Sequence, residues 1–91
     1  MPLPVRVARH FNLRQDSAAF VAGVSPGSPA VRAGLKEGDV IISFAGRPVA
    51  NLDDVHRLLT ADVIGRVIEV VLLRRWTLKR TVTIVPAPAP D

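Results

Sequence analysis

Hydrophobic residues recur along this chain in short runs whose spacing predicts both strands and helices. Four runs have the near-continuous or alternating apolar pattern of β-strands, at residues 19–24, 40–44, 67–73 and 78–85. In the last run Val82 and Ile84 alternate with threonines, which leaves one apolar face. The connection over 74–77 is short, so the last two strands are expected to pair antiparallel.

Three further segments carry helix signals, at residues 4–12, 28–35 and 51–62. Ser28 and Asn51 are preferred helix-capping residues, and Pro29 suits a first helical position. Asn12 and Gly34 can take the left-handed conformation that ends a helix. The third segment is the longest of the three and predicts the main helix.

Strands and helices do not alternate strictly, which favours a single α+β domain over a doubly wound sheet. We expect a small, mostly antiparallel, curled sheet of four to five strands, capped by one main helix and shorter helices. The chain of 91 residues suffices for one domain with a modest core. Residues 86–91 are rich in proline and alanine and predict an extended tail or linker after a domain spanning 1–85.

Composition narrows the chemistry that this chain can perform. It has no cysteine, and His10 and His56 stand far apart in the sequence, so neither a metal site nor a cofactor is expected. No serine lies in a Gly-x-Ser-x-Gly motif, and Ser28 is explained as a helix cap. We therefore predict no catalytic residue and no enzymatic activity for this chain.

The densest basic cluster lies over residues 74–80, in a chain with a net charge of +4. Arg74, Arg75 and Trp76 form a candidate partner surface here, followed by Lys79 and Arg80. In one interpretation the cluster contacts a nucleic acid or another acidic surface, with Trp76 stacking on it. In the other it is a solvated hairpin tip with Trp76 folded over its own sheet. Aromatic residues are scarce, so the second is favoured and nucleic acid is not an expected partner.

Small and turn-forming residues give the segment 25–41 a distinctive pattern, Ser-Pro-Gly-Ser-Pro-Ala-x-x-Ala-Gly-Leu-x-x-Gly-Asp-Val-Ile. Further motifs follow it in order, with Gly-Arg-Pro-Val at 46–49, Asp-Val-x-x-Leu-Leu at 54–59 and Val-Leu-x-Arg at 71–74. Together they resemble bacterial PDZ domains. The likeness is strongest to the PDZ domains that follow the trypsin-like protease domain of HtrA-type serine proteases. It covers about residues 18–85 of the chain.

This resemblance implies a peptide-binding module, in which a peptide adds as a strand to an exposed sheet edge beside the main helix. By position in the family, the peptide-binding groove carries Leu52, Val55, His56 and Leu59, with Val55 turned more toward the core. The alternative for His56 is an exposed helix histidine without a role. The family's carboxylate-binding loop has no counterpart in residues 1–4, so the chain is expected to begin after it. The missing strand would leave a sheet edge open to self-association.

The resemblance also implies partners and a location for the parent protein. Expected partners are peptides or unfolded protein segments and the parent's own protease domain. The parent is expected to be a serine endopeptidase with its catalytic domain upstream, and to be extracytoplasmic, in the periplasm or cell envelope. Two alternatives stay open. One is a docking or gating module of an envelope protein that is not a serine protease, and the other is a binder of nucleic acid or anionic surfaces.

Overall fold

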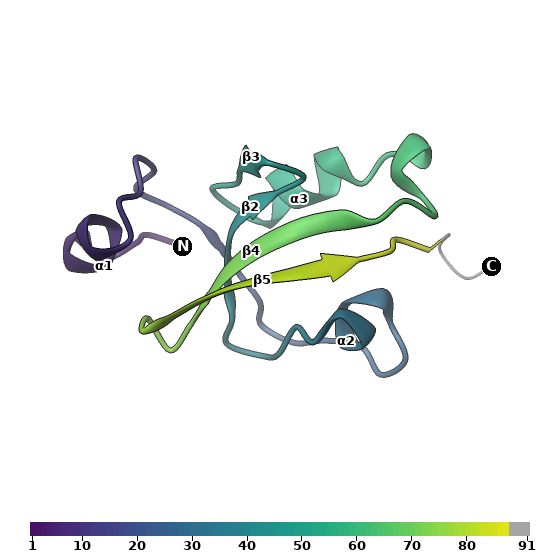
Figure 1. Cartoon of the computed structure of the whole chain (residues 1–91), viewed down its shortest axis with the longest axis horizontal. Helices are drawn as coiled ribbons and strands as arrows, with labels where there is room; N and C mark the ends of the chain where they lie inside the picture. Colours follow the sequence, from purple (N-terminus) through teal and green to yellow (C-terminus); the bar gives the residue numbers. More distant parts are fainter. Residues whose placement is uncertain (88–91) are drawn as a thin grey trace.

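The computed structural model describes residues 1–87, which form a small α+β fold around one antiparallel sheet (Figure 1). Its elements are α1 (Val5–His10), β1 (Ala19–Phe20), α2 (Pro29–Ala33), β2 (Val40–Phe44), β3 (Arg47–Pro48), α3 (Leu52–Leu58), the 3₁₀ turn η1 (Ala61–Val63), β4 (Ile68–Arg74) and β5 (Leu78–Ile84). The described strands number five, in the order β1-β2-β4-β5 with β3 paired to β2. The predicted fold class is therefore confirmed.

Antiparallel pairing links every pair of neighbouring strands in the sheet. β4 and β5 form a regular hairpin, from Ile68 opposite Ile84 to Arg74 opposite Leu78. β2 pairs with β4 on one side and with β1 and β3 on the other. Four of the five residues of β2 are buried. This burial on both faces explains why the run at 40–44 is continuously apolar rather than alternating.

Two hydrophobic clusters cover the opposite faces of the sheet. Leu72 is buried in the first cluster and its neighbour Leu73 in the second, because successive side chains of a strand point to opposite faces. Val55 of α3 belongs to the first cluster, whereas Val7 of α1 packs against the second. Accordingly, Figure 1 shows α1 at one end of the elongated molecule, well apart from α2 and α3.

Local side-chain chemistry begins both α2 and α3, as the sequence predicts. The Ser28 hydroxyl accepts a hydrogen bond from the Val31 N–H at 3.3 Å. Asn51 Oδ1 accepts from the Asp54 N–H at 2.9 Å, and Asp54 Oδ2 in turn accepts from the Ala50 N–H at 2.8 Å. This reciprocal pair satisfies two backbone donors at the start of α3 and fixes where the helix begins.

The main helix ends earlier than the predicted Asp62. α3 stops at Leu58, and Thr60 has an extended backbone with φ −90° and ψ 168°. The Thr60 hydroxyl donates to the Asp62 carboxylate, a local side-chain bond that competes with helix continuation. After Leu59 and Thr60, which are not helical, the chain forms η1 over Ala61–Val63.

Two other boundaries differ from the sequence-based expectation. β1 has two residues rather than the six of 19–24, because the chain leaves the sheet for the turn at 25–27. Two bonds persist past its end: the Val21 N–H donates to the Asp39 carbonyl at 2.9 Å, and the Val21 carbonyl accepts from the Gly38 N–H at 2.8 Å. At the other terminus Pro86 is buried, and its carbonyl accepts from the Gly65 N–H at 3.0 Å. The chain packs against the fold at least to Pro86, and residues 88–91 of the predicted tail lie outside the described residues.

Candidate functional site

Residues 1–3 form an additional edge beside the sheet. The Leu3 N–H donates to the Asp16 carbonyl at 2.7 Å, and the Ala18 N–H donates to the Met1 carbonyl at 2.8 Å. Pro2 and Ser17 form the antiparallel bridge between these two bonds. Leu3 is buried in the second hydrophobic cluster, which anchors the segment. The segment leading into β1 is therefore joined on its outer side by a short extended segment, through a single antiparallel bridge outside the five strands.

A hollow of about 290 Å³ lies between this edge and the start of α3. Its lining residues are Met1, Phe20, Asn51, Leu52 and Asp53. The three hydrophobic side chains among them are each about two-fifths exposed. A cluster of exposed apolar groups with a polar rim is typical of a surface that binds another molecule. We call this hollow, with the neighbouring exposed stripe of α3, the α3 groove.

The exposed stripe of α3 consists of Leu52, His56 and Leu59, which follow one another at the spacing of one helix face. Leu52 lines the hollow, and the other two continue its face along the helix and past its end. Val55 is buried in the first cluster and supports α3 from beneath. The four predicted groove residues thus divide into three exposed side chains and one core side chain.

Gln15 ties the N-terminal edge to the loop before α3. Its Nε2 group donates to the Ser17 carbonyl and to the Val49 carbonyl, both at 3.0 Å. Ser17 belongs to the strand beside the edge, and Val49 is buried two residues before Asn51. One amide group therefore helps to set the distance between the two walls of the groove, a role that no sequence motif indicated.

Arg74, one residue of the predicted partner surface, is engaged in hydrogen bonds within the fold. Its guanidinium donates to both carboxylate oxygens of Asp39 at 2.8 Å and to the Gly34 carbonyl at 2.9 Å. Burial alone would raise the pKa of Asp39, but the bonds from Arg74 and from the Lys36 N–H outweigh burial and lower that pKa. The pair joins α2, β2 and β4 inside the fold.

Trp76 packs onto its own molecule at the tip of the β4–β5 hairpin. It is partly buried against the second hydrophobic cluster. With Val7, His10 and Arg6 of α1 it lines a hollow of about 280 Å³. This placement agrees with the interpretation in which Trp76 folds over its own sheet, and it adds α1 as the second contact.

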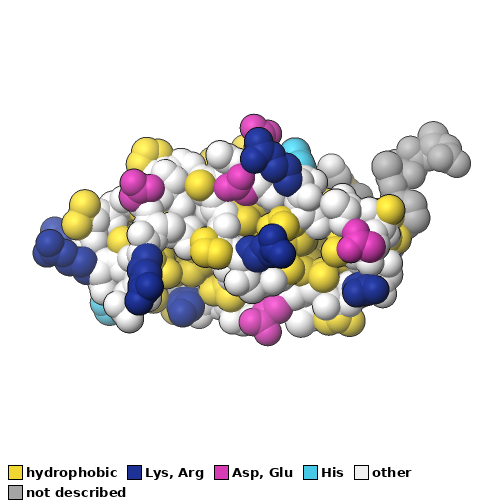
Figure 2. Space-filling view, turned by 90° about the horizontal axis from the view of Figure 1, so that it is seen from above, with side chains coloured by type: hydrophobic (Ala, Val, Ile, Leu, Met, Phe, Trp, Pro, Cys, Tyr) yellow, Lys and Arg dark blue, Asp and Glu magenta, His cyan; other side chains and the backbone are white. Residues whose placement is uncertain are grey.

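The remaining basic residues of 74–80 do not gather on one face. Lys79 lies opposite Leu73 and Arg80 opposite Leu72, and these two leucines belong to clusters on opposite faces of the sheet. Lys79 and Arg80 therefore do not form one continuous basic face on the hairpin for a nucleic acid. On the face seen in Figure 2, basic and acidic side chains alternate with exposed hydrophobic ones.

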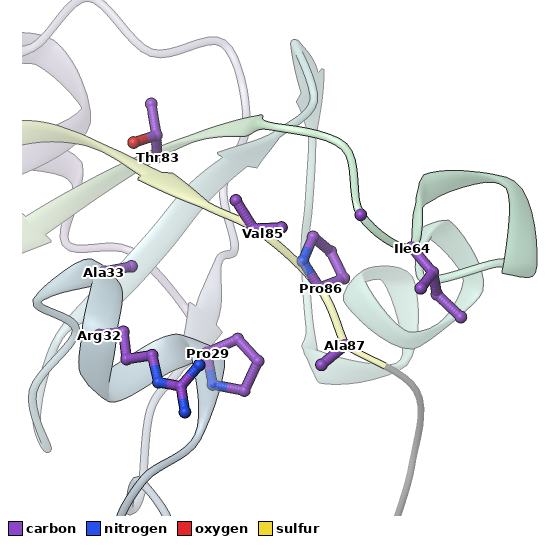
Figure 3. Close-up of a pocket in the computed structure, with 9 residues that line it drawn as sticks. Pro29, Arg32, Ala33, Ile64, Thr83, Val85, Pro86 and Ala87 are labelled. Carbon is purple, nitrogen blue, oxygen red and sulfur yellow. The ribbon is translucent and has the colours of Figure 1, made fainter.

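A third hollow, of about 490 Å³, was not indicated by the sequence. It lies between α2 and the segment after β5, with Pro29 and Arg32 on one side and Val85 and Pro86 on the other (Figure 3). Ile64 closes its end. Because these residues come from three separate segments without a shared motif, only the folded chain brings them together.

The described residues offer neither a metal site nor a membrane span. Within residues 1–87 no three His, Asp or Glu side chains group as metal ligands. In the same range no helix has the length and apolar character needed to cross a bilayer.

Comparison with known proteins gives a consistent set of relatives. A family model of the PDZ domain matches residues 20–74. The magnetosome formation protease MamE of Magnetospirillum gryphiswaldense is 38% identical over 73 residues, which are 80% of this chain and 10% of that protein. The periplasmic pH-dependent serine endoprotease DegQ of Escherichia coli is 35% identical over 68 residues, 75% of this chain and 15% of that protein. The chain thus spans a small part of the curated relatives that it matches.

Solved structures show the same fold. The HtrA-type protease AlgW with a decapeptide has a TM-score of 0.75 and 26% identity, over 100% of this chain and 28% of that chain. The HtrA3 PDZ domain bound to the phage-derived ligand FGRWV has a TM-score of 0.66 and 23% identity, over 93% of this chain and 75% of that chain.

Proposed function

Because this chain belongs to the PDZ domain family and its relatives are HtrA-type serine proteases, we propose that it is the peptide-binding module of such a protease. The observation that carries the proposal is the α3 groove. Three exposed hydrophobic side chains meet there between an open sheet edge and a helix. An extended peptide can add along the edge while its side chains enter the hollow.

Each groove residue has a role in this proposal. Leu52 contacts a hydrophobic side chain of the peptide in the hollow, and His56 and Leu59 contact residues farther along the peptide. Val55 holds α3 in place from the core. Peptides or unfolded protein segments are the ligands, and the catalytic domain of the parent protein stands outside these 91 residues.

The names of the relatives support an extracytoplasmic location. DegQ is named a periplasmic serine endoprotease, and two other relatives carry the names "probable periplasmic serine endoprotease" and "probable periplasmic serine protease". We propose the periplasm or cell envelope for the parent of this chain. In that setting the groove would bind unfolded or processed envelope proteins, and this binding would be the signal to the protease domain.

The proposal is tested by an amide-shift NMR titration with the pentapeptide FGRWV and with a mixed pool of peptides that have hydrophobic C-termini. We expect shifts around Leu52, His56 and Leu59. The titration is run on this chain and on a form extended upstream by about 15 residues, the reach of one further strand with its loop. A response of neither form would contradict peptide binding and favour the docking or gating alternative.

A matched pair of variants separates the groove from the general surface. Leu52 and Leu78 are both exposed leucines, at 43% and 52%, and only Leu52 lines the groove. Leu52→Glu should weaken peptide binding by about tenfold or more, because a carboxylate replaces an apolar contact worth 1–2 kcal/mol. Leu78→Glu should leave the affinity unchanged. Equal losses for both variants would contradict the assignment of the groove.

A contact between the hairpin tip and another part of the parent protein stays a prediction. Arg75 and the exposed part of Trp76 are the groups that would make it.

A further inference from the structure

The unpaired side of the N-terminal edge differs from an ordinary sheet edge in the backbone hydrogen-bonding groups that it presents. Three hydrogen bonds hold this segment. All of them involve the residues on either side of Pro2: the Leu3 N–H, the Met1 carbonyl and the Met1 ammonium group, which donates to the Ala18 carbonyl. In such an antiparallel bridge the N and C=O groups of the bridging residue itself point away from the partner strand. The backbone of Pro2 therefore faces the unpaired edge, along which a peptide would add.

Proline has no N–H group, so Pro2 presents a carbonyl acceptor to this edge and no donor. By the alternation of a strand, Pro4 is the next residue whose N would face the same side, and it too has no N–H. The Pro4 carbonyl is already used, since it accepts from the N–H groups of Val7 and Ala8 at 3.0 Å. Over residues 2–4 the edge thus offers one free acceptor and no donor.

We propose that this groove binds its peptide through a one-sided backbone contact, in which a peptide N–H donates to the Pro2 carbonyl while the peptide carbonyl beside it receives no bond from the edge. This inference rests on the proposed function. A strand that docks on an ordinary edge both donates to and accepts from each outward-facing residue. Here half of that exchange is missing, so the apolar contacts with Phe20 and Leu52 carry more of the selectivity.

The lack of N–H donors at Pro2 and Pro4 also acts against pairing of two copies of the chain at this edge. Edge prolines block strand addition because they remove ladder donors. The self-association expected from an open edge is therefore disfavoured by Pro2 and Pro4. Pro2 sets how strongly any strand, from a peptide or from another copy, can pair here.

The test is Pro2→Ala, which supplies the missing N–H without adding a large side chain. We expect FGRWV, or the strongest binder of the peptide pool, to bind about 2- to 10-fold tighter, the worth of one added backbone hydrogen bond. The matched control carries N-methylalanine at position 2, introduced by chemical ligation. It removes the proline ring but has no N–H, and it should bind like the original chain. Affinity is measured by calorimetry on whichever form responds in the NMR titration.

Unchanged affinity of a folded Pro2→Ala chain would overturn the inference while leaving peptide binding intact. An equal gain in the N-methylalanine control would also overturn it, since the ring and not the N–H would then be responsible. A readout without peptide separates this inference from the proposed function. In sedimentation velocity, Pro2→Ala should self-associate at lower concentration than either the original chain or the control. Absence of peptide binding by all forms would end the proposed function, and this sedimentation difference would still test the edge.

Discussion

At the scale of single residues, Asp39 connects parts of the fold that lie far apart in the sequence. It is the buried charged side chain of the described residues, at 1% exposure, and Arg74 stands 35 positions away. Its oxygens accept from the Arg74 guanidinium and from the Lys36 N–H. Because Arg74 also bonds to Gly34, the carboxylate fixes the end of α2 against the start of β2. A buried carboxylate is tolerated only with such complete pairing.

Asp39→Asn should lower the free energy of unfolding at pH 7 by about 2–3 kcal/mol, since it removes the buried carboxylate that the partly buried Arg74 guanidinium pairs with. Urea unfolding measures this loss. The exposed Asp53, which takes no part in this pair, supplies the control: Asp53→Asn should change the free energy of unfolding by less than about 0.5 kcal/mol. Similar effects of the two substitutions would show that the pair contributes little.

The lowered pKa of Asp39 also predicts how stability depends on pH. A carboxyl group with a lowered pKa in the folded state stabilises the fold above its ordinary pKa of 3.8. That contribution is lost as pH falls below about 4 and through the lowered folded value. Unfolding curves of the original chain and of Asp39→Asn should therefore differ most near neutral pH and converge toward pH 2. A constant difference over this range would contradict the role given to the ionised form.

At the scale of elements, the connection between β4 and β5 contains backbone strain. Arg75 and Trp76 both have positive φ, at 57° and 61°, although neither is glycine or asparagine. Each L-residue in this left-handed region costs about 1–2 kcal/mol. The regular pairing from Ile68–Ile84 to Arg74–Leu78 holds the strands together despite this cost. Packing of Trp76 against the second cluster offsets part of it.

Arg75→Asn should raise the free energy of unfolding by about 0.5–1 kcal/mol, because asparagine adopts the left-handed conformation more readily than arginine. Urea unfolding provides the measurement. Arg80→Asn is the matched control, since Arg80 is exposed within β5 and is not among the residues with positive φ. It should give no gain. Destabilisation by Arg75→Asn would mean that the arginine side chain makes a contact worth more than the strain.

Elements that depend on local chemistry could be predicted from the sequence. The capping residues Ser28 and Asn51 start α2 and α3, and the apolar run at 40–44 is β2 with the predicted bounds. The sequence did not predict the end of α3, where local side-chain hydrogen bonds compete with helix formation. α3 ends at Leu58, and the Thr60 hydroxyl just beyond it bonds locally to Asp62, a bond that helical periodicity does not reveal.

The candidate site depends on non-local contacts and was only half visible in the sequence. The family pattern indicated the α3 stripe of Leu52, His56 and Leu59. It did not indicate that Met1 and Phe20 complete the hollow, or that Gln15 spans its two walls. Arg74 looked like a surface cation because its partner Asp39 is distant in the chain. Charge pairing across a fold is not encoded in any short motif.

At the scale of the whole molecule, the two faces of the sheet differ in how many buried hydrophobic residues pack on them. Among residues 1–87 the first cluster has twice as many buried residues as the second, ten against five. α1 belongs to the weaker face and contains no buried residue of its own. It is held by partly buried groups such as Val7, Phe11 and Trp76. Segments with few buried contacts open at a lower free energy than the core, so α1 should open before the sheet does.

Trp76→Ser tests this hierarchy, because it removes the group that joins the hairpin tip to α1. A partly buried tryptophan is worth less than a fully buried one, so we expect a loss of about 1–2 kcal/mol concentrated in the opening of α1. In hydrogen exchange, the amides of α1 should then exchange about 5- to 30-fold faster, while those of Val70 and Leu72 in β4 change little. Leu78→Ser, at the other end of the same connection and half exposed, should leave α1 unaffected.

The pattern of exchange decides among the interpretations of Trp76. Acceleration confined to α1 means that the tryptophan is a clamp between two parts of one molecule. Equal acceleration throughout β4 would place it in the cooperative core instead. No acceleration anywhere would mean that its contact with α1 stabilises nothing, and the tryptophan would then be retained for a partner. In that last case Arg75, whose positive φ is a standing cost, becomes the next residue to substitute in a binding experiment with the parent's protease domain.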